Sequence, residues 1–269
     1  TGARGPAPAS IAALGQTQLS EWVAISGAAV SSGMGSLTSA GVAALSFLSG
    51  FRLGYWWRGL SSTPMWSWRW FGKYRGTFAE MLARFPGLRT PAWYLSDGGH
   101  FDNTGVYALL KRKLALIVLA DCGADPHYLF ADLENLIRKA RVDYNATIEF
   151  IDPASLPETA LANVLRPRFG TPDSIMPGVG EQHLLLARIR YHDGTLGALL
   201  VIKPRRHPRL PLDVAGYADH DPGFPQQSTG DQFFDEAQWE SYCELGCALG
   251  MPLSGELLDA LPQWSRDGV

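Results

Sequence analysis

Apolar and polar positions alternate most regularly from residue 92 onward. The segment AWYLS (92–96) predicts a short strand, and the apolar run LALIVLA (114–120) predicts a strand buried on both faces. Between them, VYALLKRK (106–113) places its apolar residues on one helical face and its basic residues in the last turn. Strand, helix and strand within about thirty residues predict a right-handed β-α-β unit.

The same pattern then repeats. Pro126 suits the first turn of a helix, and ATIEFID (146–152) predicts the next strand. Between them, apolar residues recur at helical spacing: Leu129, Leu133, Leu136, Ile137 and Ala140. The region from 92 to 152 is therefore expected to build an α/β fold with a mainly parallel sheet.

A hairpin is predicted further along the chain. Two alternating runs, 185–191 and 196–202, flank Asp193-Gly194, which favours a type I′ turn. The proline-rich residues 204–225 are expected to form a long connection. Thr229 and Gln232 have capping-box spacing before a helix over 233–246. The hairpin would add an antiparallel extension to the sheet.

The first ninety residues show less regular patterning. Residues 1–18, rich in Gly, Pro and Ala, predict a linker, after which Ser20 can cap a helix. Residues 22–51 carry no charge, which is long enough for a membrane span, but their Gly, Ala and Ser content favours a closely packed buried helix. Residues 52–91 show no clean period and are expected to form a surface loop.

Composition narrows the class of protein. The chain has 269 residues, of which 46% are hydrophobic and 18% charged, so it is neither disordered nor fibrous. A net charge of −3 argues against a nucleic-acid-binding protein. Three cysteines suit a reducing compartment, and Cys243 and Cys247, one helical turn apart without a histidine pair, indicate helix packing rather than zinc.

The charge is unevenly distributed. Residues 1–100 hold eight basic and three acidic residues, a net charge of +5, whereas residues 101–269 have a net charge of −8. Basic residues and tryptophans are interleaved in the basic part, which fits either docking at a lipid–water interface or burial of the indoles against a missing half of the fold. The residues concerned are Arg52, Trp56, Trp57, Arg58, Trp66, Trp68, Arg69, Trp70, Lys73 and Arg75.

Acidic loops follow two of the predicted strands, where ligands bind in open α/β sheets. Asp97, followed by Gly98 and Gly99, is a candidate general base, and positive φ angles at the two glycines would let the backbone approach a substrate closely. The alternative is an ordinary turn. His100 either contacts a head group or is a solvated loop histidine. The second loop holds Asp121 and Asp125, which could bind a cation or cap a helix.

Three segments, in this order, resemble the patatin-like and cytosolic phospholipase A family. The run YLSDGGHFDNTGVYALLKRKLALIVLADCGADP is similar to the region of its acidic motif, in which Asp-Gly-Gly supplies the aspartate of a Ser–Asp dyad. AISGAAVSSGMG resembles the small-residue segment before that motif. FPQQSTGDQFFDEAQWESYCELG is similar to the tail of large bacterial members. Together these segments cover roughly residues 20–250.

The resemblance implies a lipid acyl hydrolase. Its fold would be a patatin-like three-layer α/β sheet with helices on both faces, mainly parallel with an antiparallel hairpin extension. Asp97 would take the proton of a serine that attacks an ester carbonyl, with Gly98, Gly99 and His100 in the active-site loop and no metal or cofactor. The implied substrate is a phospholipid or other acyl ester, and the implied location is the cytoplasm of a bacterium, peripherally bound to a membrane surface.

One element of the family pattern is missing. These 269 residues contain no G-x-S-x-G motif and no glycine-rich oxyanion loop, and Ser26 and Ser31 fit packing or capping better than nucleophilic attack. The chain also begins without Met. We therefore expect residues 19–269 to be the later, C-terminal portion of a larger catalytic domain, with the serine on a preceding segment or a partner chain. The alternative is a non-catalytic patatin-like interaction or regulatory module.

Overall fold

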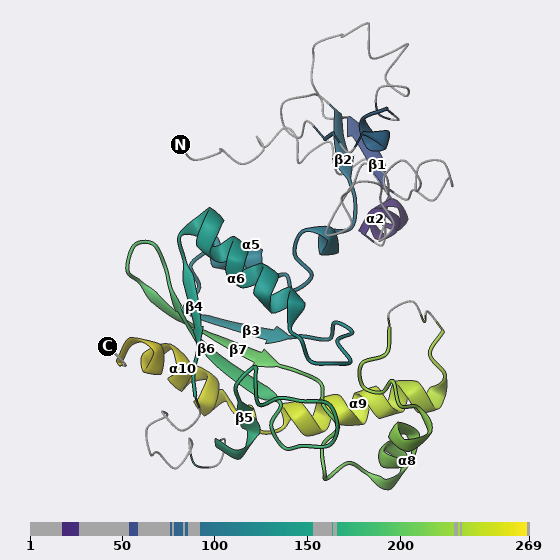
Figure 1. The fold of residues 1–269 in the computed structure, drawn as a ribbon, viewed down its shortest axis with the longest axis vertical. Helices are drawn as coiled ribbons and strands as arrows, with labels where there is room; N and C mark the ends of the chain where they lie inside the picture. The colour runs from purple at the N-terminus through teal and green to yellow at the C-terminus, as the bar shows by residue number, and fades with distance from the viewer. Residues whose placement is uncertain are drawn as a thin grey trace, which may run out of the picture. The chain divides into compact units, whose positions relative to one another are not determined.

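The computed structural model describes residues 18–26, 54–58, 76, 78–82, 84–85, 92–152, 163, 166–228, 231 and 233–267. The chain divides into two compact units, residues 1–103 and residues 104–269. Figure 1 gives the order of the elements along the chain.

The first unit contains a short helix and a two-stranded sheet. Helix α2 spans Leu19–Ser26, so Ser20 lies inside the helix rather than capping it. Strands β1 (Tyr55–Arg58) and β2 (Ala92–Leu95) pair antiparallel, with Tyr55 opposite Leu95. The prediction that residues 52–91 form only loop is therefore wrong at β1, where the aromatic residues of one strand pack on those of the other.

The second unit is built on a mixed sheet. Its strands are β3 (Leu116–Ala120), β4 (Thr147–Phe150), β5 (Phe169–Gly170), β6 (Leu184–Arg190) and β7 (Leu196–Ile202). The order is β3-β7-β6-β4, and β5 also pairs with β6. The β3–β7 and β5–β6 pairings are parallel, whereas β6–β7 and β4–β6 are antiparallel. The α/β class is confirmed, but the sheet is mixed and not mainly parallel.

The hairpin explains why the sheet is mixed. Strands β3 and β4 run in the same direction and are joined through a helix, but β7 and β6 lie between them, so the predicted neighbours are separated. The first predicted β-α-β unit is not formed, since β2 pairs with β1 and the five-stranded sheet is built without it. The apolar patterns predicted where the strands lie but not which strands pair, because pairing between distant strands leaves no local signal in the sequence.

The hairpin itself is confirmed, with a different turn. Within the loop 191–195, Gly194 alone has a positive φ, of 82°. The Gly194 N–H donates to Tyr191 O at 2.9 Å, and the Tyr191 N–H donates to Thr195 O at 2.9 Å. A type I′ turn needs two consecutive positive φ angles, whereas a three-residue loop needs one glycine after a type I turn. The loop is of this three-residue kind.

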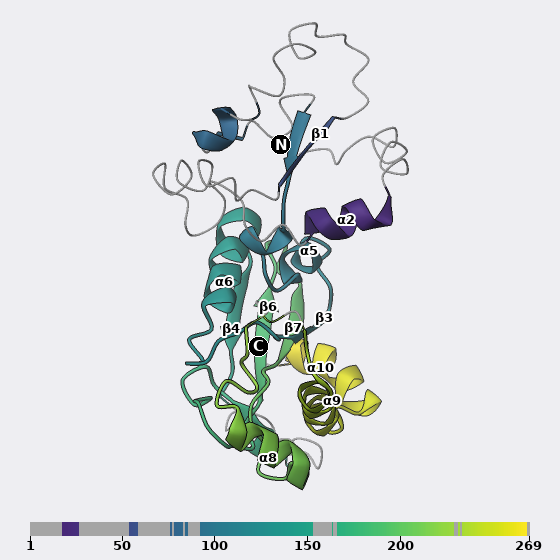
Figure 2. The same ribbon diagram turned by 90° about the vertical axis from the view of Figure 1, so that its right-hand side faces the viewer.

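Helices cover both faces of the second unit's sheet, as Figure 2 shows. Helices α5 (Val106–Leu110) and α6 (Ala131–Tyr144) pack on one face, where the core holds Leu110, Leu133 and Leu136. Helix α10 (Gly255–Asp267) packs Leu257 and Leu261 against the other face. Successive residues of β6 and β7 contribute to opposite clusters, so both strands are buried on both sides. The expected helix–sheet–helix layering is present in this unit.

Several helix boundaries differ from those expected. Helix α6 begins at Ala131, so Pro126 and Leu129 belong to the loop before it. The proline-rich connection contains helix α8 (Leu212–His220), which packs on α9 (Glu236–Gly250). The Asp235 carboxylate caps α9 by accepting from Gln238 N at 2.8 Å. Thr229 and Gln232 lie outside the described residues.

Among the residues that the structure describes, no helix combines the length and apolar character needed to cross a membrane. Most of the uncharged stretch 22–51 lies outside the described residues, and so do Ser31 and residues 1–17 of the expected linker.

Candidate functional site

The Asp97 loop is a tight turn at the end of β2. Strand β2 ends at Leu95, and Asp97 is the N-cap residue of a 3₁₀ helix over Gly98–His100. The Gly99 N–H donates to Asp97 Oδ1 at 2.8 Å, and the Asp97 side chain is half-buried. The carboxylate is therefore oriented by the backbone two residues further on, as is common for aspartate in turns.

The two glycines play different parts in this turn. Neither has the positive φ that the Asp-Gly-Gly sequence allows. A Cβ on Gly99 would lie 3.0 Å from the side-chain oxygen of Asn103 and 3.4 Å from Asp97 Oδ1, whereas a Cβ on Gly98 would meet no atom within 4 Å. Gly99 is thus required for the close approach of two side chains, and Gly98 is not.

His100 closes the same turn. Its Nδ1 lies 3.1 Å from the backbone oxygen of Asp97 and 3.2 Å from Ser96 Oγ. A carbonyl oxygen only accepts, so this contact requires the ring proton on Nδ1. In the neutral ring the lone pair is then on Nε2, on the side of the ring away from Ser96. His100 is half-buried, so part of its ring remains accessible to solvent.

Two of the tryptophans in the basic region are described. Trp57 is buried with its ring 5.3 Å from that of Trp93. Trp56 donates its indole N–H to the buried Glu80 at 2.7 Å and packs 5.2 Å from the ring of Tyr94. Both indoles therefore pack against residues of this chain rather than against a missing half. Trp66, Trp68, Trp70 and the side chain of Arg58 lie outside the described residues.

The second acidic loop, between β3 and α6, surrounds a buried lysine. Lys203, which directly follows β7, is 1% exposed, and its Nζ lies 3.1 Å from Asp121 Oδ2 and 3.9 Å from Asp125 Oδ2. It also donates to Gly123 O at 3.2 Å and lies over the ring of Phe130. The ammonium group stands where the cation interpretation would place a metal ion. Among the described residues, no group of three His, Cys, Asp or Glu side chains is arranged to hold one.

Asp125 also fixes the backbone of this loop. Its two carboxylate oxygens accept from Leu129 N at 2.9 Å and Phe130 N at 2.8 Å. Tyr128 and Phe130 have φ angles of 52° and 54°, a region that bulky side chains rarely adopt. Each residue in this conformation lowers the stability of the fold by roughly 1–3 kcal/mol, so the conformation persists only where surrounding contacts fix it. The observed role of Asp125 therefore agrees better with the capping interpretation than with the metal interpretation. Its contacts with Leu129 N and Phe130 N lie just before the start of helix α6.

Cys243 and Cys247 are both exposed on helix α9, so the prediction that they pack inside a helix interface is wrong. The buried side of the helix is formed by Gln238, Ser241, Leu245 and Leu249.

Sequence reasoning missed Lys203, although a signal for it was present. The run LGALLVIK (196–203) ends an apolar strand with a lysine and opens the basic, proline-rich segment KPRRHPR. A lysine at the carboxyl end of a buried strand lies at the same sheet edge as the acidic loop after a parallel neighbour. The parallel pairing of β3 with β7, which brings the two together, was the missing information.

Comparison with protein-family models, with curated proteins and with solved structures finds no match for this chain.

Proposed function

We propose that this chain supplies the aspartate of a patatin-like lipid acyl hydrolase. Asp97 takes the proton of a serine that lies on polypeptide outside these 269 residues, and the substrate is a phospholipid or other acyl ester at a membrane surface. The observation that carries the proposal is the ordered match of sequence segments around Asp97, together with the position of that residue in a tight turn at the end of a strand.

The hydrogen bonding of Asp97 supports the role of a base. Within the described parts of the chain, Gly99 is the one donor to the carboxylate, and it binds Oδ1. Oδ2 is then the oxygen that can accept a proton from an incoming hydroxyl. A carboxylate held in one orientation by its own backbone needs little reorganisation when the hydroxyl arrives.

His100 adds a second polar group to the same turn. With Nδ1 engaged by the Asp97 carbonyl, Nε2 is the ring atom that can bind a hydrogen-bond donor, or a phosphate when the ring is protonated. This fits the expected role of His100 as a contact for a lipid head group.

The test is ester hydrolysis by the native assembly, isolated through a tag on this chain. We expect cleavage of a fluorescent phosphatidylcholine, and loss of about three orders of magnitude in kcat for Asp97→Asn, as for removal of a general base. Asp213→Asn is the matched control, because it makes the same change at an exposed aspartate in the first turn of α8. A fluorophosphonate probe should label a serine on another segment or chain, and label it more slowly in the Asp97→Asn assembly.

The outcomes separate this proposal from its alternative. Full activity of Asp97→Asn would refute the base, and labelling of Ser26 or Ser31 would refute an external nucleophile. An assembly that hydrolyses no ester and labels no serine would favour a non-catalytic interaction module. That alternative is supported by the geometry too, since a carboxylate that caps a 3₁₀ helix is a sufficient structural role for Asp97.

A further inference from the structure

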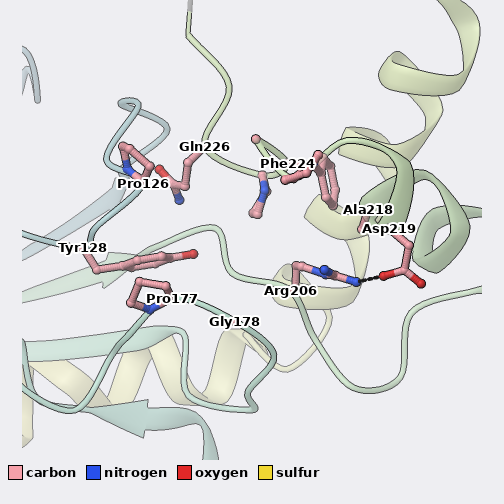
Figure 3. Close-up of a pocket in the computed structure, with 12 residues that line it drawn as sticks. Pro126, Tyr128, Pro177, Gly178, Arg206, Ala218, Asp219, Phe224 and Gln226 are labelled. Carbon is pink, nitrogen blue, oxygen red and sulfur yellow. Dashed lines mark hydrogen bonds and ion pairs between the residues drawn. The ribbon is translucent and has the colours of Figure 1, made fainter.

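A cavity of about 280 Å³ lies in the second unit, beyond the carboxyl ends of β3 and β7. The loop after β3 contributes Pro126 and Tyr128, and the segment after β7 contributes Arg206. Figure 3 shows Tyr128 and Pro177 on one side of it, and Phe224 and Ala218 on the other. Adjacent parallel strands commonly place ligands at this edge of a sheet.

Half of the residues that line the cavity carry rings, namely Pro126, Tyr128, Pro177, Pro222, Phe224 and Pro225, and the polar side chains of Tyr128 and Gln226 are hydrogen-bonded. Gln226 accepts from Asp125 N at 2.9 Å and donates to Pro204 O at 2.7 Å. The Tyr128 hydroxyl donates to the same Pro204 oxygen at 3.0 Å. Burial raises the pKa of the Tyr128 phenol, which therefore stays neutral and does not repel an anion. The cavity thus offers ring faces to a ligand beside the polar groups of Arg206 and Asp219.

Arg206 is the cation of this cavity. Its side chain is 27% exposed and pairs with Asp219 at 2.6 Å, while the Asp219 side chain is 71% exposed (Figure 3). Within the described residues, Asp219 is the one side chain bound by the Arg206 guanidinium, which has five donors in all. An ion pair with so exposed a carboxylate is weak. A ligand anion can therefore compete for this arginine.

The backbone at Arg206 is tied to the neighbouring loop. Arg206 O accepts from Gly180 N at 2.9 Å. The preceding Arg205 is 9% exposed and donates instead to the carbonyl oxygens of Gly178 and Gln182. One arginine of the pair thus holds the neighbouring loop, and the next one faces the cavity.

We propose that this cavity binds a small organic anion, namely a carboxylate or phosphate carried on one compact ring. Arg206 binds the charged group in place of Asp219, and the ring packs among Tyr128, Pro177 and Phe224. The size agrees with this class, because a cavity of about 150 Å³ already holds benzene. The inference concerns only the second unit and is independent of the role of Asp97.

The test is titration calorimetry of the full chain with benzoate, phenyl phosphate, inorganic phosphate and benzyl alcohol. We expect benzoate or phenyl phosphate to bind more tightly than inorganic phosphate, which lacks the ring, and than benzyl alcohol, which lacks the charge. The order of benzoate and phenyl phosphate then decides between a carboxylate and a phosphate ligand.

Three variants test the role of Arg206, and they should weaken binding, strengthen binding and leave it unchanged. Arg206→Gln should weaken binding about tenfold, the value of one charge-assisted hydrogen bond. Asp219→Asn should strengthen it by about two- to fivefold, because the competing carboxylate is gone. Arg209→Gln is the matched control, since Arg209 is 74% exposed and pairs with Glu181. Equal binding by Arg206→Gln and Arg209→Gln, weaker binding by Asp219→Asn, or no binding of either ring anion would overturn the proposal.

Discussion

Two acidic loops follow strands in this chain, and their carboxylates are used in different ways. In the loop after β2, the Asp97 carboxylate is held by the N–H of Gly99, a contact within the same turn. In the loop after β3, Asp121 and Asp125 surround the ammonium group of Lys203, which comes from a strand more than seventy residues later. The partner of Asp97 is supplied by a local turn, whereas the partner of Asp121 and Asp125 is supplied by the fold of the whole sheet.

The difference decides which loop can take part in chemistry. A carboxylate that neutralises a buried lysine is tied to the stability of the fold, since removing either partner leaves an uncompensated buried charge. A carboxylate held by one N–H has a remaining oxygen for a proton or a ligand. The loop with two aspartates, Asp121 and Asp125, therefore has a structural role.

Replacement of Lys203 is the strongest test of this difference. Lys203→Met leaves Asp121 and Asp125 facing an apolar side chain, and we expect it to lower the free energy of unfolding by about 3–5 kcal/mol. Urea unfolding followed by circular dichroism measures the change. Because many domains are stable by only about 5–15 kcal/mol, Lys203→Arg serves as a second variant that keeps the charge if Lys203→Met does not fold.

The matched control is Lys113→Met. Lys113 pairs with Asp193 at 2.5 Å, but both side chains are 36% exposed, so the loss should stay below about 1 kcal/mol. Equal effects of the two lysine replacements would show that the buried group of charges has no special structural role.

A smaller effect is expected from the aspartates that bind backbone N–H groups. Asp125→Ala removes the acceptors of Leu129 N and Phe130 N, while Asp121 at 3.1 Å still neutralises Lys203, so the cost should be about 2 kcal/mol. Asp97→Ala removes one acceptor in an exposed turn and should cost about 1 kcal/mol or less. Urea midpoints of the two variants, compared with that of the unchanged chain, give the order. A larger loss for Asp97→Ala would mean that the two loops have been assigned the wrong way round.

The sequence predicted the elements of the second unit better than their arrangement. Strands β3, β4, β6 and β7 and helix α6 lie where apolar periodicity placed them, because that signal is local and strong. Their order in the sheet could not be predicted, since β7 pairs with β3 across about eighty residues. Helix α8 was missed because its small and polar residues lie in a proline-rich segment that favours a loop.

The site shows the same limit. The position of Asp97 after a strand was predictable from the Asp-Gly-Gly signal, but its turn geometry was not, because neither glycine has the expected positive φ. The role of Gly99 was not, because it depends on Asn103 coming back to within 3.0 Å of where a Cβ would lie. Arg206 and Lys203 were not distinguished from the other basic residues of KPRRHPR, since alternate burial along that segment follows from packing in the folded sheet.

The smallest effect concerns Cys122, which lies between the strand β3 and the lysine site. Cys122 is exposed, yet desolvation of its thiol by the surrounding protein, and then the charge of Asp121, raise its pKa above the ordinary value of 9.0, while Lys203 acts in the opposite sense. The folded chain therefore holds the thiol proton more tightly than the unfolded chain, and this contribution to stability is lost as the pH rises above about 9. At pH 8, iodoacetamide should modify Cys122 more slowly in the folded chain than in urea, as followed by peptide mass spectrometry.

The control for this measurement is Cys243, whose pKa is raised first by the neighbouring Cys247. Cys247→Ser should speed the modification of Cys243 and leave the rate at Cys122 unchanged, because the two sites have different charged neighbours. Faster modification of Cys122 in the folded chain than in urea would contradict the placement of its thiol beside Asp121, and with it the account of this loop as a closed group of charges around Lys203.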